Sequence, residues 1–315
     1  MTVQTSQSTY PTGAGPMPVR ITRPPGRGPF PAMIDVHGGA WTWFSPEVDF
    51  FWCRELARRG FVMVSPTFRT SLTAPWPACF DDVRAARAWV RTHAGELDVD
   101  PHRVGVIGGS TGGHLAAMLG MHVPDVAWVI ALWPILDVEA RYRMVRDARF
   151  SRLVERLAAP MQATPDGEAT VRRLRRLDEV RRRAPSLFDP LGSLLQRLYA
   201  TLGDLELSRA LLFRALRDAH ERTFRDVDTM RLASPVELLH SGDVVARPPM
   251  LIVQGDRDPN VTWAMTERFA HEYQMQGGPI ELHLRRGLGH SYGNLPSREA
   301  EDLVELTSAF ARRAA

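Results

Sequence analysis

Short apolar runs alternate with longer amphipathic segments along most of the chain. Apolar runs with the length of buried strands occupy residues 31–36, 61–66, 103–107, 126–133, 249–254 and 280–284. Segments with apolar residues at helical spacing lie at 49–60, 80–94, 261–275 and 298–314. Because strands that alternate with helices build a mostly parallel sheet covered on both faces, the pattern predicts an α/β fold.

Two segments depart from this alternation. Residues 1–18 are polar and rich in Thr, Ser, Gly and Pro, so we expect a flexible N-terminal arm. Residues 139–232 carry leucines at helical spacing, which predicts a helical insertion. We expect the insertion to form a cap over the carboxyl edge of the sheet, where α/β folds bind ligands. The core then comprises residues 19–138 and 233–315.

The composition is that of a soluble globular protein, with 315 residues, 44% of them hydrophobic, and a net charge of +3. No apolar run reaches the roughly 18–20 residues that a membrane span requires. The N-terminus also lacks the basic and apolar regions of a secretory signal. We therefore expect a cytoplasmic protein without a membrane partner. Two cysteines, Cys53 and Cys79, are too few for a disulfide framework or a metal site, and we expect buried thiols.

Positive charge is concentrated in the insertion. All 39 basic residues are arginine, and residues 141–231 contain 20 of them against 13 Asp and Glu. A basic block can indicate nucleic-acid binding, but these arginines alternate with leucines at helical spacing. Solvated helix faces explain the pattern better, so we expect no nucleic-acid partner.

Residues 108–113, Gly-Gly-Ser-Thr-Gly-Gly, carry a strong chemical signal. They contain Gly-x-Ser-x-Gly between an apolar run that ends at Ile107 and a helical pattern that starts at His114. At such a strand-to-helix turn the hydroxyl of Ser110 is exposed, and the amides at the start of the helix point toward whatever bonds to it. An ordinary tight turn fits the hexapeptide equally well, so the rest of the chain has to decide.

A second glycine turn follows the strand at 31–36. It reads His37-Gly38-Gly39-Ala40-Trp41, and without side chains its amides can approach a ligand. Backbone amides of this kind stabilise a developing oxyanion. The alternative is an ordinary turn at the end of a strand.

Two further loops end strands at the same edge of the expected sheet. One carries Asp258 after the strand at 249–254, and the other carries His290 after the strand at 280–284. A serine hydroxyl is a weak nucleophile until a base takes its proton, and that base needs an acceptor on its second nitrogen. The chain order Ser, Asp, His is that of the α/β-hydrolases.

The sequence resembles the esterase/lipase group of the α/β-hydrolases, which includes hormone-sensitive-lipase-like, feruloyl-esterase-like and kynurenine-formamidase-like enzymes. The resemblance covers residues 19–140 and 232–312. It rests on His37-Gly38-Gly39, Phe68-Arg69, 74–77, 98–117, Trp133-Pro134, 233–235, Gly255-x-x-Asp258 and Gly289-His290. It implies the α/β-hydrolase fold, a mostly parallel sheet with helices on both faces and a helical cap insertion.

Site residues follow from the resemblance, position by position. Ser110 would be the nucleophile, His290 the general base and acid, and Asp258 the orienting carboxylate. Asp256 is the rival acid, but relatives place the aspartate three residues after the glycine that ends the strand. The oxyanion hole would be the amides of Gly38, Gly39 and Thr111.

Several positions depart from the family pattern and leave the substrate open. Ala40 stands where the lipase-like branch usually has a third glycine, which favours the formamidase-like or feruloyl-esterase-like branch. Gly109 replaces a frequent aspartate before the nucleophile. We take His37 and His114 as structural. The loop aromatics Trp41, Trp76 and Trp133 are expected to contact substrate.

The function expected from the sequence is hydrolysis of a small to medium carboxylic ester through an acyl-enzyme. An arylformamide, amide or carbamate would use the same residues, and a hydrolase fold that only senses a ligand is the alternative of another class. We expect neither a cofactor nor a metal. The expected partner is a small-molecule substrate, and a homodimer is left open.

Overall fold

The computed structural model of the chain describes residues 2–146 and 216–314. The chain forms two compact units, one of residues Met1–Arg141 and Arg222–Ala315, the other of residues Tyr142–Glu221. The second unit covers fewer residues than the insertion expected over 139–232, because Arg222 and the residues after it belong to the first unit. Most of the expected helical insertion lies outside the described residues, and its role as a cap stays a prediction.

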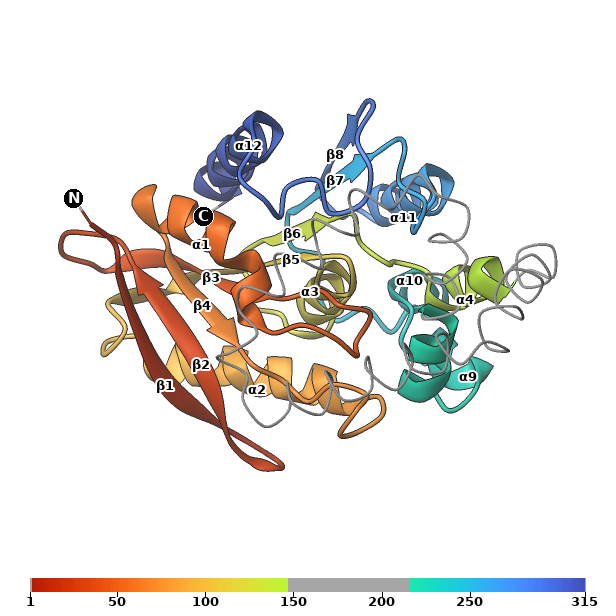
Figure 1. Ribbon diagram of the computed structural model, residues 1–315, viewed down its shortest axis with the longest axis horizontal. Helices are drawn as coiled ribbons and strands as arrows, with labels where there is room; N and C mark the ends of the chain where they lie inside the picture. Colours follow the sequence, from red (N-terminus) through yellow and green to blue (C-terminus); the bar gives the residue numbers. More distant parts are fainter. Residues whose placement is uncertain (1, 147–215, 315) are drawn as a thin grey trace, which may run out of the picture. The chain divides into compact units, whose positions relative to one another are not determined.

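The first unit is built on one eight-stranded sheet with strand order β1-β2-β4-β3-β5-β6-β7-β8 (Figure 1). From β4 to β8 neighbouring strands are parallel, whereas β2 pairs antiparallel with both β1 and β4. The strands are β1 Gln4–Thr12, β2 Gly15–Arg23, β3 Phe30–Val36, β4 Val62–Pro66, β5 Val99–Gly109, β6 Val129–Leu132, β7 Met250–Gly255 and β8 Ile280–Arg285.

Helices α1 and α12 lie on one face of the sheet, and α2 and α3 lie on the other (Figure 1). This two-sided cover confirms the predicted α/β architecture. The helical elements of the described residues are η1 Pro46–Asp49, α1 Phe50–Arg58, α2 Ala78–Thr92, α3 Thr111–His122, α4 Val138–Arg146, α9 Val227–Leu232, α10 Pro235–Ser241, α11 Trp263–Met275 and α12 Arg298–Ala314.

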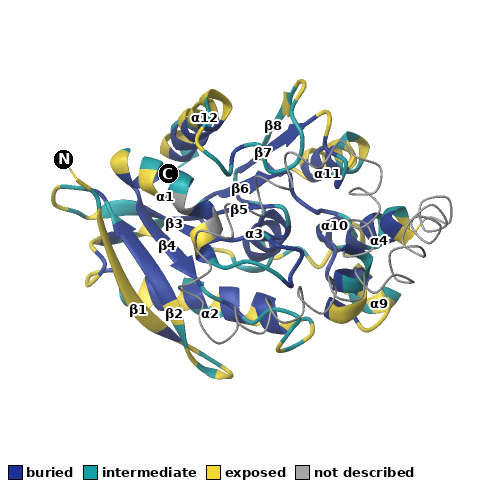
Figure 2. Ribbon diagram, viewed as in Figure 1, coloured by how far each residue is buried: buried dark blue, intermediate teal, exposed yellow. Residues whose placement is uncertain are grey.

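The expected flexible arm at residues 1–18 is wrong. Residues from Gln4 onward form the hairpin of β1 and β2, which occupies one edge of the sheet. Most of β1 is exposed (Figure 2), so its polar sequence gives no apolar alternation that would have indicated a strand. Tyr10 is the buried exception, and its hydroxyl donates to the carbonyl of Thr67 at 2.6 Å.

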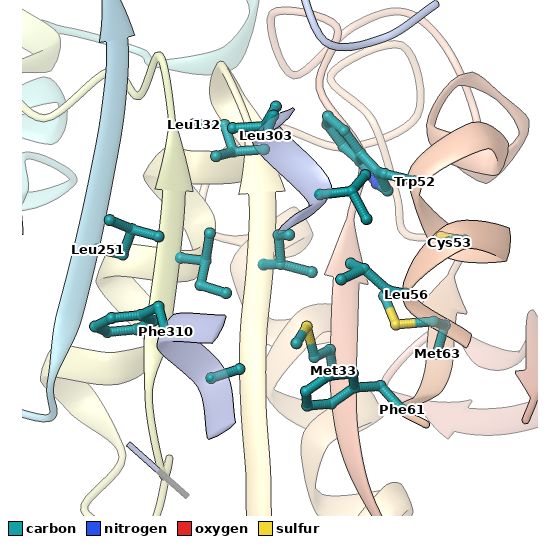
Figure 3. Packing of buried hydrophobic residues seen from close by; sticks show 14 of the residues in the cluster. Met33, Trp52, Cys53, Leu56, Phe61, Met63, Leu132, Leu251, Leu303 and Phe310 are labelled. Carbon is teal, nitrogen blue, oxygen red and sulfur yellow. The ribbon is translucent and has the colours of Figure 1, made fainter. Parts of the chain in front are cut away.

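The core beneath α1 and α12 is apolar and continuous across the sheet (Figure 3). Met33 of β3 and Leu251 of β7 belong to the same buried cluster as side chains from both helices, among them Leu56 of α1 and Phe310 of α12. A buried carboxyl group, that of Asp35 on β3, accepts hydrogen bonds from Trp52, Cys53 and Ser65. Burial raises the pKa of Asp35 because the charged carboxylate loses its hydration.

Because β3 and β5 to β8 are parallel, their carboxyl ends meet at one edge of the sheet. The register pairs Val36 with Gly108 and Gly109 with Leu132. The loops that follow these strands therefore begin side by side. No described helix is both long and apolar enough to cross a membrane.

Candidate active site

Ser110 is the single residue between β5 and α3. Its backbone has φ 59° and ψ −119°, a conformation that L-residues rarely adopt. The surrounding backbone leaves no room for a side chain at Gly112, where a Cβ would collide with the carbonyl oxygen of Val36. The strained turn therefore presents the serine hydroxyl at the carboxyl edge of the sheet, as the Gly-x-Ser-x-Gly pattern predicts.

Ser110, His290 and Asp258 form a continuous chain of hydrogen bonds. The Nε2 of His290 lies 3.0 Å from the Oγ of Ser110, and its Nδ1 lies 2.7 Å from Oδ2 of Asp258. The carboxylate accepts the Nδ1–H, so Nε2 is free to accept the proton of the serine hydroxyl. The side chain of Asp258 is completely buried and that of His290 is 8% exposed.

The second oxygen of the Asp258 carboxylate is also hydrogen-bonded. Its Oδ1 accepts the backbone N–H of Asn260 at 2.7 Å and that of Val261 at 3.0 Å. Asp256 is exposed and accepts the backbone N–H of Gly287 at 2.6 Å. Asp258 is thus the acid that meets His290, while Asp256 fastens the end of β8.

The His37–Trp41 turn passes directly beside the serine. A Cβ on Gly38 would stand 2.8 Å from the carbonyl oxygen of Gly109 and 3.5 Å from the Cβ of Ser110. None of the hydrogen bonds among the described residues uses the amide N–H of Gly38, Gly39 or Thr111. These amides are therefore available to an anion beside Ser110.

The amide of Ala40 is equally unused among the described residues. The sequence marks Ala40 as a departure from the family pattern but does not assign its amide to the oxyanion hole. Ala40 has a φ of 52°, which the sequence could not indicate at a residue other than glycine. Non-glycine residues with positive φ recur in the loops around the serine, namely Ala40, Trp41, Ser110, Trp133 and Ser291. Backbone strain of this kind is concentrated at functional sites.

His114 fastens the glycine turn to α3. Its Nδ1 accepts the indole N–H of Trp41 at 3.1 Å, so its Nε2 carries the proton and donates to the carbonyl of Ala233 at 2.6 Å. Complete burial lowers the pKa of His114 to about 4 because the imidazolium would lose its hydration. The side chain is therefore neutral near pH 7 and acts as a structural bridge. His37 stacks on Phe68 with its ring centroid 4.2 Å away.

Two of the three tryptophans expected to contact substrate do not fit that role. The side chains of Trp41 and Trp133 are each 1% exposed, so they offer almost no surface to a ligand. Trp76 is partly exposed and stacks on Phe80, with centroids 5.5 Å apart. The sequence placed all three in loops at the correct edge, but burial depends on packing between loops that the sequence does not specify.

The described residues offer no metal site, since no three of their His, Cys, Asp or Glu side chains gather closely enough to hold an ion. What the arrangement can do is activate a hydroxyl. A buried carboxylate orients an imidazole, the imidazole contacts a strained serine, and unused amides lie beside that serine.

Two family models match the chain. Residues 21–152 match the family described as BD-FAE, and residues 213–315 match the prolyl oligopeptidase family. Similar curated proteins include the carboxylic ester hydrolase LipN of Mycobacterium tuberculosis, 32% identical over 154 residues that cover 45% of this chain and 40% of LipN. Esterase LipC of the same organism is 31% identical over 179 residues, which cover 52% of this chain and 44% of LipC. The matches thus span less than half the length of these relatives.

Solved structures resemble the chain over nearly its whole length. An esterase from Pyrobaculum calidifontis superposes with a TM-score of 0.70 at 20% identity, covering 98% of this chain and 85% of that structure. EstE1, a carboxylesterase cloned from a metagenomic library, gives a TM-score of 0.69 at 20% identity, with coverage of 99% and 89%. At this identity the likeness concerns the fold, which is that of the α/β-hydrolases.

Proposed function

We propose that this chain, which belongs to the esterase/lipase group of the α/β-hydrolases, is a serine hydrolase that cleaves a small to medium carboxylic ester. The observation that carries the proposal is the hydrogen-bonded chain from Ser110 through His290 to Asp258. The esterases and carboxylic ester hydrolases among its relatives support the same class of reaction.

In the first half of the reaction, the Oγ of Ser110 attacks the carbonyl carbon of the ester while Nε2 of His290 takes the hydroxyl proton. The negative charge that develops on the carbonyl oxygen is stabilised by the amides of Gly38, Gly39 and Thr111. Asp258 stabilises the imidazolium and holds its tautomer. The C–O bond of the ester then breaks, and His290 gives its proton to the departing alcohol, which leaves an acyl group on Ser110.

In the second half, His290 takes a proton from a water molecule while the water oxygen attacks the acyl carbon. The second tetrahedral intermediate places its oxyanion against the same amides. The bond to Ser110 breaks, Oγ regains its proton from His290, and the free acid leaves. The same residues would cleave an arylformamide or a carbamate, with His290 protonating the leaving group. The fold alone does not decide among these bonds, because it presents one nucleophile to any carbonyl substrate.

A substrate panel tests the proposal. We expect p-nitrophenyl esters of short and medium acyl chains to give a higher kcat/KM than an arylformamide or an aryl carbamate. Replacing Ser110 by alanine should lower kcat by on the order of 10⁴-fold or more, since the nucleophile is lost. The exposed Ser241→Ala is the matched control and should keep the wild-type rate.

Each outcome has a defined meaning. A higher kcat/KM for the formamide or the carbamate would replace the ester as the substrate but keep the serine mechanism. Unchanged hydrolysis by Ser110→Ala would overturn the proposed function. If no substrate is hydrolysed by the wild-type chain, the ligand-sensing alternative is favoured.

A further inference from the structure

Trp133 follows β6 directly and is fixed in an unusual backbone conformation. Its φ is 40°, and its N–H donates to the carbonyl of Val253 at 2.7 Å, so the strand pairing with β7 extends through it. The indole is 1% exposed. A bulky side chain that is held in a strained conformation requires surroundings that determine its position closely.

The indole of Trp133 lies next to His290 on one side and next to Gly109, the neighbour of Ser110, on the other. Its ring lies 6.3 Å from the ring of His290 at an interplanar angle of 63°, and 5.0 Å from the ring of Tyr292. On the other side it reaches Gly109, the residue before the nucleophile. A Cβ on Gly109 would stand 2.9 Å from the indole Nε1 and 3.3 Å from its Cε2.

A second glycine makes room for the same ring. A Cβ on Gly293, three residues after His290, would stand 3.1 Å from the indole Cη2 and would also collide with Leu303. Trp133 therefore fills the space between two glycines, one next to Ser110 and the other in the loop that carries His290.

We propose that Trp133 is a positioning residue that sets the distance between Ser110 and His290. This inference rests on the proposed function. The indole separates the serine turn from the histidine loop, and both glycines are required because any side chain there would displace it.

The role predicts a specific kinetic defect. Without the ring, the His290 loop can move, and the 3.0 Å contact between Nε2 and Oγ is no longer fixed. A displacement of about 1 Å at a reacting group can cost roughly 10²-fold in rate. Because the indole has almost no exposed surface, substrate binding should change little. We therefore expect Trp133→Ala to lower kcat about 10²-fold while KM stays within about threefold.

A double-mutant cycle separates positioning from general packing. Gly109→Ala places a methyl group against Nε1 of Trp133 and should lower kcat by a similar factor. Both substitutions act on the same contact, because the methyl group no longer meets an indole once Trp133 is alanine. Gly109→Ala combined with Trp133→Ala should therefore be at most about threefold slower than Trp133→Ala alone. The ring of Trp52, 3.2 Å from the same methyl position, is unchanged in every variant.

The chain contains a matched control pair. Trp128 is completely buried, and its indole lies against Gly105, an earlier residue of the same strand β5. Trp128→Phe removes an equally buried indole that has no contact with Ser110 or His290. It should lower the melting temperature without lowering kcat.

The outcomes are distinct. If Trp133→Ala and Trp128→Phe lower kcat equally, or if the losses caused by Gly109→Ala and Trp133→Ala multiply in the double variant, the positioning role is refuted. If the wild-type chain shows no activity that depends on Ser110, the proposed function itself fails. A selective kcat defect, with losses that do not multiply in the double variant, supports the inference.

Discussion

Asp256 and Asp258 are two residues apart in one loop, yet their surroundings differ completely. Asp258 is buried and bonds to His290 and to two backbone amides, whereas Asp256 is exposed and bonds to Gly287. The spacing after Gly255 favoured Asp258 from the sequence, and the contacts agree with that choice. Only the structure reveals the two amides that hold the carboxylate, because they depend on how the loop folds back on itself.

This difference predicts an asymmetry between two isosteric variants. Asp258→Asn should lower kcat by roughly 10³–10⁴-fold, because the neutral asparagine side chain stabilises neither the imidazolium nor the required tautomer of His290. Asp256→Asn should stay within about threefold of wild type. Steady-state kinetics on one p-nitrophenyl ester is sufficient, with circular dichroism as the check on folding. A greater loss for Asp256→Asn would contradict the assignment.

At the scale of elements, one buried histidine of α3, His114, joins the glycine turn after β3 to Ala233. His114 accepts from Trp41 and donates to Ala233, so protonation of Nδ1 would oppose the indole N–H. The sequence marked His114 as a motif histidine with a structural role. Its partners could not be predicted, since Ala233 lies 119 positions further along the chain.

The lowered pKa of His114 makes stability depend on pH. In the unfolded chain the imidazole binds a proton near pH 6.5, but in the folded chain it does so only near pH 4. The unfolded state therefore binds more protons between these values, and the free energy of unfolding falls as pH drops through this window. A shift of this size corresponds to about 3 kcal/mol of stability, which is fully present above about pH 6.5 and is lost by about pH 4.

Urea unfolding of wild type and His114→Gln between pH 4 and pH 8 measures this term. Glutamine can accept from Trp41 and donate to Ala233, but it does not titrate. The stability difference between the two proteins should therefore move by about 3 kcal/mol in favour of the variant from pH 7 to pH 4. A difference that stays constant with pH would show that His114 is not the group responsible.

For the whole molecule, the regular parts of the fold were the predictable ones. Residues 31–36, 61–66 and 249–254 are apolar because their strands are buried on both faces, and the structure confirms β3, β4 and β7 there. Strand β1 was missed because an exposed edge strand needs no apolar pattern. Local pattern indicates a buried element, but pairing at an edge depends on the rest of the sheet.

In the candidate site, too, some features could be predicted from the sequence and others depend on packing. Ser110, Asp258 and His290 were predictable because parallel strands bring their loops to one edge, whatever the distance along the chain. The burial of Trp41 and Trp133 was not predictable, because it arises where several such loops pack together. Both side chains are buried and offer almost no surface to a ligand.

The central claim is that Ser110 is an activated nucleophile, and its covalent reaction with a fluorophosphonate tests this most directly. Intact-protein mass spectrometry after brief exposure to the probe should show one adduct on the wild-type chain. Peptide mapping should locate that adduct on Ser110, and Ser110→Ala should remain unmodified. An unmodified wild-type chain, or an adduct that persists in Ser110→Ala, would contradict the account.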